Sequence, residues 1–249
     1  MAKLTLLDIV QSILSDMDGD EVSSISDTVE ATQVAQIVKD TYFEILGSRH
    51  WPHLDQLIQL TAGTATTSPT HMATTDSWNE LEWVKYNVRK ATDTKDIYQD
   101  IIYLTPKEFT DLTNARDSSK TDVDTITHSG TLKLFILNDT APKYWTTFND
   151  ETLVFDAYDS GVETNLQQSK SQCWGNVQGT WVNTDTAIPD LPAKAFAYLL
   201  SEAKSTASSS LRQAGNAKEE QKSRRQRVFL ARDKWRVGGG MQFPHYGRK

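Results

Sequence analysis

Cysteine is almost absent from this sequence, and long apolar runs are absent altogether. Cys173 is the only cysteine in 249 residues, so an internal disulfide and a zinc site built from several cysteines are both excluded. We therefore expect a chain that is made and folded in a reducing cytoplasm. No run of eighteen apolar residues occurs, so we expect neither a membrane-spanning segment nor a membrane partner. The opening residues also lack the apolar core of a signal peptide.

The common sequence signatures of catalysis are missing as well. We find no G-x-S-x-G elbow, no P-loop and no G-x-G-x-x-G pattern. Cys173 lies beside Trp174, which favours a buried structural thiol over a nucleophile. A pair of carboxylates of the glycosidase type stays open, because spacing along a chain does not give the distance between two carboxyl groups. We expect no enzymatic activity, no catalytic residues and no cofactor.

Two patterns invite a metal interpretation, and we reject both. His50 and His53 have the spacing of two ligands on a helix, but Pro52 lies between them and no third ligand follows. The acidic run 16–27 places aspartates at alternate positions, as a calcium-binding loop does. Glu21, however, occupies the position that requires glycine in such a loop. We interpret the run as a solvated turn between two helices and expect no metal site.

Charge is divided unevenly along the chain. Residues 212–249 contain eleven basic and three acidic residues, a local charge of +8, whereas residues 1–211 carry −15. Such an asymmetry indicates an acidic or polyanionic partner for the basic end, with a solvated helix as the simpler alternative.

Helical patterns occupy both ends of the chain. Apolar residues recur at helical spacing from Leu6 to Met17 after a Thr5 cap, and again from Val34 to Leu46, where Gly47 ends the pattern. Asp27 with Glu30 resembles a capping pair for the second helix. Near the C-terminus we predict a helix after an Asp190 cap and another that an Asn216–Glu219 pair begins.

The middle of the chain reads as strands. Short runs rich in β-branched and aromatic residues alternate with polar turns, and one helix, capped by Thr105 before Pro106, interrupts them. The predicted strands are Leu57–Thr61, Glu80–Val88, Ile97–Leu104, Leu132–Leu137, Lys143–Phe148, Leu153–Ala157 and a weaker run near Gln172–Trp174. Five tryptophans lie in this part, and we expect one or two of them to anchor a neighbouring subunit.

These patterns predict an α+β fold in which the terminal helices pack as a bundle, with a central β-rich insertion and an extended C-terminal arm. We divide the chain into a helical hairpin (1–55), a β-rich insertion domain (56–188), C-terminal helices (189–237) and a docking arm (238–249).

The C-terminal part supplies the candidate interaction residues. Its basic helix contains Lys218, Lys222, Arg224, Arg225, Arg227, Arg232, Lys234, Trp235 and Arg236. The arm behind it joins three glycines to aromatic and basic residues, namely Gly238, Gly239, Gly240, Phe243, Pro244, Tyr246, Arg248 and Lys249. A flexible segment with apolar anchors is typical of chains that become ordered when they dock into a partner, and a disordered end is the alternative.

The layout resembles the head-to-tail adaptor proteins of short-tailed bacteriophages, also called tail tubular or head-completion proteins. The likeness rests on the opening helical pair and on Ile45–Trp51, where Arg49 and Trp51 match a small residue, Arg, any residue, Trp junction. It rests further on the acidic approach 22–27, the β-rich middle and the helical return 191–236.

This resemblance implies a structural protein of the virion at the head–tail junction, made in the host cytoplasm. It implies a homo-oligomeric ring of twelve subunits that binds the portal protein through residues 191–249 and a downstream tail or nozzle protein through the β-rich part. DNA would pass through the ring during packaging and ejection without sequence-specific contact. The alternative from the residues alone is a nucleic-acid-binding protein that uses the basic helix 218–236.

Overall fold

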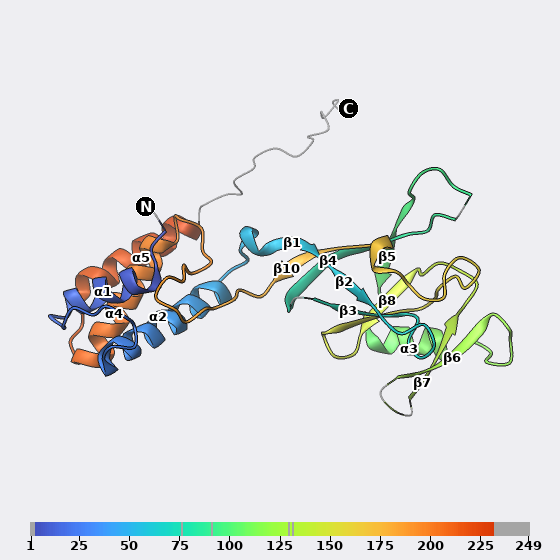
Figure 1. Cartoon of the computed structure of the whole chain (residues 1–249), viewed down its shortest axis with the longest axis horizontal. Coiled ribbons are helices and arrows are strands. Elements are labelled where there is room, and N and C mark those ends of the chain that lie inside the picture. Colours follow the sequence, from blue (N-terminus) through green and yellow to red (C-terminus); the bar gives the residue numbers. More distant parts are fainter. Residues whose placement is uncertain (1–2, 76, 91, 129, 131, 232–249) are drawn as a thin grey trace, which may run out of the picture. The chain divides into compact units, whose positions relative to one another are not determined.

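A computed structural model describes residues 3–75, 77–90, 92–128, 130 and 132–231 (Figure 1). The chain forms two compact units. One consists of residues 1–53 and 179–249, and the other of residues 54–178. The segment 179–188 thus groups with the helices, whereas our division places it in the β-rich part. The four-part division itself stays a prediction.

The predicted fold class is wrong. The protein is an α+β protein whose centre is a strand-rich, nearly closed eight-stranded sheet, rather than a helical bundle that carries an insertion. The error has a physical cause. Short strand patterns reveal neither which strands pair nor that β1 (Asp55–Ile58) joins β10 (Ser171–Val177) from the other end of the same unit.

The sheet follows the order β1-β10-β4-β5-β8-β9-β3-β2. Its remaining strands are β2 (Leu60–Ala62), β3 (His71–Thr74), β4 (Trp78–Asn87), β5 (Tyr98–Tyr103), β8 (Tyr144–Thr147) and β9 (Thr152–Phe155). Only β5 and β8 pair in parallel, and the other neighbours are antiparallel. The last strand, β2, contacts β10 again, so the sheet nearly closes on itself. β3 lies in the Thr- and Ser-rich stretch 61–77 and is not among the predicted strands.

Strand register separates an inner from an outer face of this sheet. Ile58, Cys173, Val84 and Ile101 lie side by side on β1, β10, β4 and β5, and all four are buried. One residue along each strand, the side chains point the other way, because alternate side chains face opposite sides of a sheet. The inner row supplies the core of the unit.

A two-stranded sheet of β6 (Val123–His128) and β7 (Leu132–Leu137) and one helix complete this unit. The helix α3 (Pro106–Asn114) begins as predicted, since Thr105 and Glu108 form a capping box in front of Pro106. Phe109 on α3 is fully buried and contacts the ring of Phe148. α3 packs on β7 and β8.

Four helices form the described core of the other unit (Figure 1). They are α1 (Leu6–Asp16), α2 (Val29–Gly47), α4 (Phe196–Arg212) and α5 (Ala217–Ala231). The predicted apolar stripe of α1 is buried from Leu6 to Leu14, and the Thr5 capping box with Asp8 is confirmed. No helix in the described part of the chain has both the length and the apolar character needed to cross a membrane.

Two predicted caps are wrong. Thr28, not Asp27, caps α2 and accepts a hydrogen bond from the Ala31 amide. The carboxylate of Asp27 instead accepts the amides of residues 23 and 24, so the preceding turn uses it. Helix α4 starts only at Phe196, behind Ala195, and no side chain caps it. Pro192 disfavours a helix that begins at Leu191, since a proline disfavours the helical conformation of the residue before it.

Candidate functional site

A hollow in the β-rich unit opens where β4 and β5 diverge. β4 pairs with β10 from Trp78 to Tyr86, but it pairs with β5 only from Val84 to Asn87. Beyond Ile101, the backbone of β5 forms its hydrogen bonds with β8 instead of β4. The two strands therefore diverge and enclose a hollow of about 510 Å³, within the size range of ligand pockets.

A pair of β-bulges explains the divergence. The register of β10 against β4 shifts between Trp174 and Gly175 and again between Asn176 and Val177. Bulges increase the local twist and bend the strand that contains them. Gly175 is required here, because a Cβ at this position would lie 2.3 Å from the Glu80 carbonyl oxygen. The bulged segment carries the first half of β4 away from β5.

Aromatic rings and carboxylates line this hollow. The rings belong to Trp78, Trp83, Tyr103 and Trp145, and the carboxylates to Glu80, Glu82, Asp100 and Asp150. Tyr103 meets Trp145 edge to face, with ring centres 4.9 Å apart. The Trp78 indole Nε1 is buried without a hydrogen-bond partner in the described structure. Within the described part of the chain, no basic residue belongs to the lining.

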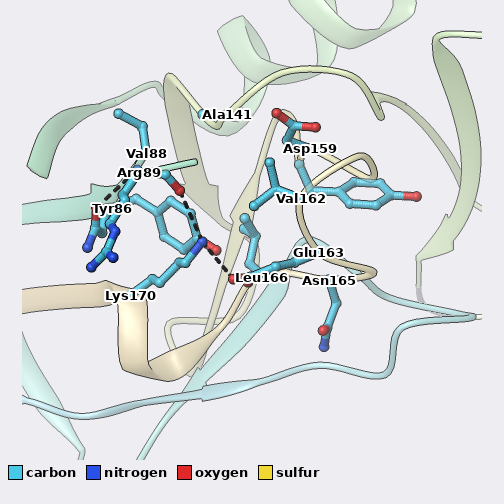
Figure 2. A pocket seen from close by; sticks show the side chains of 12 residues that line it. Tyr86, Val88, Arg89, Ala141, Asp159, Val162, Glu163, Asn165, Leu166 and Lys170 are labelled. Atoms are coloured by element: carbon cyan, nitrogen blue, oxygen red, sulfur yellow. Dashed lines mark hydrogen bonds and ion pairs between the residues drawn. The ribbon is translucent and has the colours of Figure 1, made fainter. Parts of the chain in front are cut away.

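A second cavity, shown in Figure 2, is too small for a ligand. Its volume is about 20 Å³, enough for a water molecule. The Lys170 ammonium points into it and pairs with the Glu163 carboxylate at 2.6 Å (Figure 2). The Tyr86 hydroxyl accepts the amide of Gln167, and burial raises the pKa of this phenol to about 12. These contacts fasten the loop before β10 to the sheet.

The helical unit has a smaller apolar hollow of about 170 Å³. Trp181, Val182 and Ile188 line it, and the last two side chains are exposed by half or more. The Trp181 indole Nε1 is buried without a hydrogen-bond partner in the described structure. The Trp181 ring packs against Tyr42, whose hydroxyl donates to the Thr180 carbonyl at 3.0 Å.

The predicted junction residues Arg49 and Trp51 lie together at the end of α2. Trp51 is buried and its indole Nε1 donates to the Ile45 carbonyl at 3.0 Å. The Arg49 guanidinium covers the Trp51 ring and donates to the carbonyl of Leu230 on α5. The pair therefore connects α2 to α5, which is a structural task within one subunit.

The basic helix is only partly within the described residues. Its described members, namely Lys218, Lys222, Arg224, Arg225 and Arg227, are all exposed on α5. Glu219 and Glu220 form ion pairs with Lys222 and Arg224, which reduces the local positive charge. Arg232, Lys234, Trp235, Arg236 and the whole arm Gly238–Lys249 lie outside the described residues.

The patterns that we rejected as metal or catalytic sites have other contacts. In the acidic loop, Asp16 pairs with Lys204 on α4 at 2.7 Å. Among the described residues, no group of three or more potential ligands could hold a metal ion. The predicted burial of Cys173 is confirmed, and burial raises the pKa of its thiol to about 12.

Sequence reasoning missed two polar clusters of the β-rich unit. Arg116 and Asp156 form a buried ion pair at 2.9 Å, although forty residues separate them. The Nε2 atom of His71 lies 3.0 Å from Nδ1 of His128, and the two rings stack. Burial, and next the neighbouring His128, lower the pKa of His71 to about 4. No local pattern reveals such pairs, because each joins residues that are distant in sequence.

No protein-family model matches this sequence, and a search of curated proteins gives no significant match.

Proposed function

We propose that this protein is a structural virion subunit that assembles into an adaptor ring between the portal and the tail of a short-tailed bacteriophage. The ring would form part of the channel through which DNA is packaged and ejected. Its subunits act through contacts with one another and with neighbouring proteins, and no reaction is part of this role.

The observation that carries the proposal is an apolar strip on the outer face of the sheet. Leu57, Trp174 and Trp83 are register partners on β1, β10 and β4. Leu57 is 65% exposed, and both tryptophans remain partly exposed. Contiguous apolar surface of this kind is typical of protein interfaces, and tryptophan is a favoured anchor there. A ring needs such a patch, because its subunits meet through unlike surfaces that close on themselves.

The helical unit offers a second surface of the same character. Val182 is 58% exposed and Ile188 is 50% exposed at the edge of the Trp181 hollow. Two apolar surfaces, one on each unit, suit a subunit that contacts more than one neighbour. The Arg49–Trp51 junction adds the resemblance in sequence, since it occupies the position at which the adaptor family has its own Arg and Trp.

The test is the mass of the full chain alone and after mixing with the portal protein of the same virion. Light scattering after size-exclusion chromatography should show a ring on the portal, and the Leu57→Asp variant should reduce ring formation at least tenfold. Gln56→Asp is the matched control, because Gln56 lies on the same strand but its side chain faces the opposite side of the sheet. A chain that stays monomeric with portal present at micromolar concentration contradicts the proposal.

The exposed arginines of α5 favour nucleic-acid binding as a second candidate. No acidic side chain among the described residues forms an ion pair with Arg225 or Arg227. Their exposed charges could therefore contact phosphates. This function predicts duplex binding that weakens steeply with salt and is lost in the R224E/R225E/R227E variant. Salt-insensitive or absent DNA binding by the free chain favours the adaptor role.

A further inference from the structure

We propose that the hollow between β4 and β5 binds an extended segment of another polypeptide, which pairs with the free edge of β4 and places an arginine among the aromatic rings and carboxylates. The inference rests on the proposed function, since it names the chemistry of one contact that the adaptor makes. Four observations of the β-rich unit carry it.

The first observation is the open edge of β4. Its residues 78–83 pair with β10 on one side, and no strand in the described chain pairs with them on the other. An unpaired strand edge presents amide and carbonyl groups that a further strand can satisfy. The edge faces the hollow, so a bound segment would occupy space that is already present.

The second observation is the character of the walls. The exposed Tyr103 and the partly exposed Trp78 and Trp83 offer ring faces and edges to the hollow. Aromatic faces attract cations, and the planar guanidinium of arginine stacks on them better than the ammonium of lysine. The buried Trp78 Nε1, which lacks an acceptor among the described residues, is a donor that a carbonyl of the bound segment could satisfy.

The third observation is the charge of the lining. Glu80 and Glu82 are exposed on β4, and Asp100 and Asp150 lie on the facing strand and turn. The turn that presents Asp150 is fixed, since the Asn149 side chain accepts the amides of residues 151 and 152. Four carboxylates, with no basic side chain among the described lining residues, favour a cationic guest and repel the phosphates of nucleic acid.

The fourth observation is that one cation of this chain, Lys85, already contacts an aromatic ring and a carboxylate at the edge of the hollow. The Lys85 ammonium lies 5.0 Å from the centre of the Trp83 ring and 3.5 Å from an Asp100 carboxylate oxygen. Aromatic ring, carboxylate and cation therefore combine at the edge of the hollow. Glu80 and Glu82 add two carboxylates to this arrangement, and none of the described residues of the lining is basic.

The experiment is a titration of the isotope-labelled full chain with three short peptides. The first is acetyl-Thr-Val-Arg-Val-Thr-amide, the second replaces arginine with citrulline, and the third methylates the two valine amides. Citrulline keeps the shape of arginine without its charge, and methylation blocks strand pairing. Indole resonances of Trp78 and Trp83, assigned through Trp→Phe variants, report binding at the hollow.

We expect the arginine peptide to shift both indole resonances and to bind at least about tenfold more tightly than either analogue. The E80Q/E82Q variant should lose most of this preference. The D111N/E151Q variant, which changes the net charge equally outside the hollow, should retain it. Circular dichroism checks that both variants are folded.

Four results would overturn the inference. Absence of binding by the arginine peptide at millimolar concentration removes the site, and equal affinity of the citrulline peptide removes the charge recognition. Equal affinity of the methylated peptide removes the strand pairing.

If maltotriose shifts the same indole resonances and the arginine peptide does not, the hollow is a sugar site. Because the titration uses the isolated chain, its outcome is independent of whether the chain forms a ring on a portal.

Discussion

The Arg49 guanidinium carbon lies 4.1 Å from the centre of the Trp51 ring, and the same side chain donates to the Leu230 carbonyl on α5. One arginine thus covers a buried tryptophan and connects the end of α2 to a second helix. The contact gives a physical reason for an Arg-x-Trp sequence at this junction.

Replacing Trp51 with alanine should strongly destabilise the helical unit. The ring is 2% exposed and its indole nitrogen donates to the Ile45 carbonyl, so the substitution leaves a cavity and removes a buried hydrogen bond. We expect a loss of about 3–5 kcal/mol in the free energy of unfolding, as for other large buried aromatics. Urea denaturation measures it. Gln33→Ala, at an exposed position of α2, should change the same quantity by less than about 0.5 kcal/mol. Equal effects of the two substitutions would contradict the proposed packing.

Removing one partner of the Arg116–Asp156 pair should cost far more than removing an exposed pair. Arg116 also donates to the carbonyls of Phe135 and Asp156, and the Asp156 carboxylate accepts the amides of Lys143 and Tyr144. The Asp156→Asn substitution leaves a buried guanidinium without its counter-charge, so we expect a loss of about 3–5 kcal/mol. Thermal and urea unfolding both report it.

The matched control is the exposed Lys85–Asp100 pair on the outer face. Asp100 is largely exposed there, and its side chain retains 76% of its accessible area. Asp100→Asn should therefore cost less than about 1 kcal/mol. A cost for Asp156→Asn as small as that would show that Arg116 is not held by this carboxylate.

Stability should fall in mild acid because of His71. Its pKa in the folded chain is about 4, below the ordinary value of 6.5, so the unfolded chain binds more protons between these values. The contribution is fully present above pH 6.5 and is lost as the pH falls toward 4. We expect the free energy of unfolding to decrease by on the order of 2 kcal/mol from pH 7 to 4.5.

The His71→Gln variant tests the origin of this pH dependence. Without the imidazole of His71, the decrease in the free energy of unfolding between pH 7 and 4.5 should flatten. Urea unfolding at half-unit pH steps provides the curves. A profile of His71→Gln that retains the full decrease would assign the effect to other groups.

Gly175 should tolerate no side chain. A Cβ there would approach the Glu80 carbonyl oxygen and the Leu81 Cα at 3.0 Å or less, and both are backbone atoms that cannot move aside alone. We expect Gly175→Ala to destabilise the β-rich unit by about 2 kcal/mol or more and to alter the hollow. Gly47→Ala, where a Cβ meets nothing within 4 Å, is the control and should be neutral or slightly stabilising. Urea unfolding and tryptophan fluorescence follow both effects.

The local sequence of this protein predicts several of its helix caps, the end of α2 and the positions of most strands. Thr5 and Thr105 cap their helices as their neighbours predict, Gly47 ends α2, and most strands follow runs of β-branched and aromatic residues. These features depend on residues three or four positions apart, which a sequence displays directly. The sequence also indicated, from the neighbouring Trp174, that Cys173 would be buried.

Only the tertiary structure decided how the strands combine and where the hollow lies. The pairing of β1 with β10, the bulge at Gly175 and the pairs Arg116–Asp156 and His71–His128 all join residues far apart in the chain. Their partners are selected by the closure of the sheet as a whole, because a local pattern carries no information about strand order. For the same reason the predicted helical bundle with a β insertion was wrong, although most of its individual elements exist.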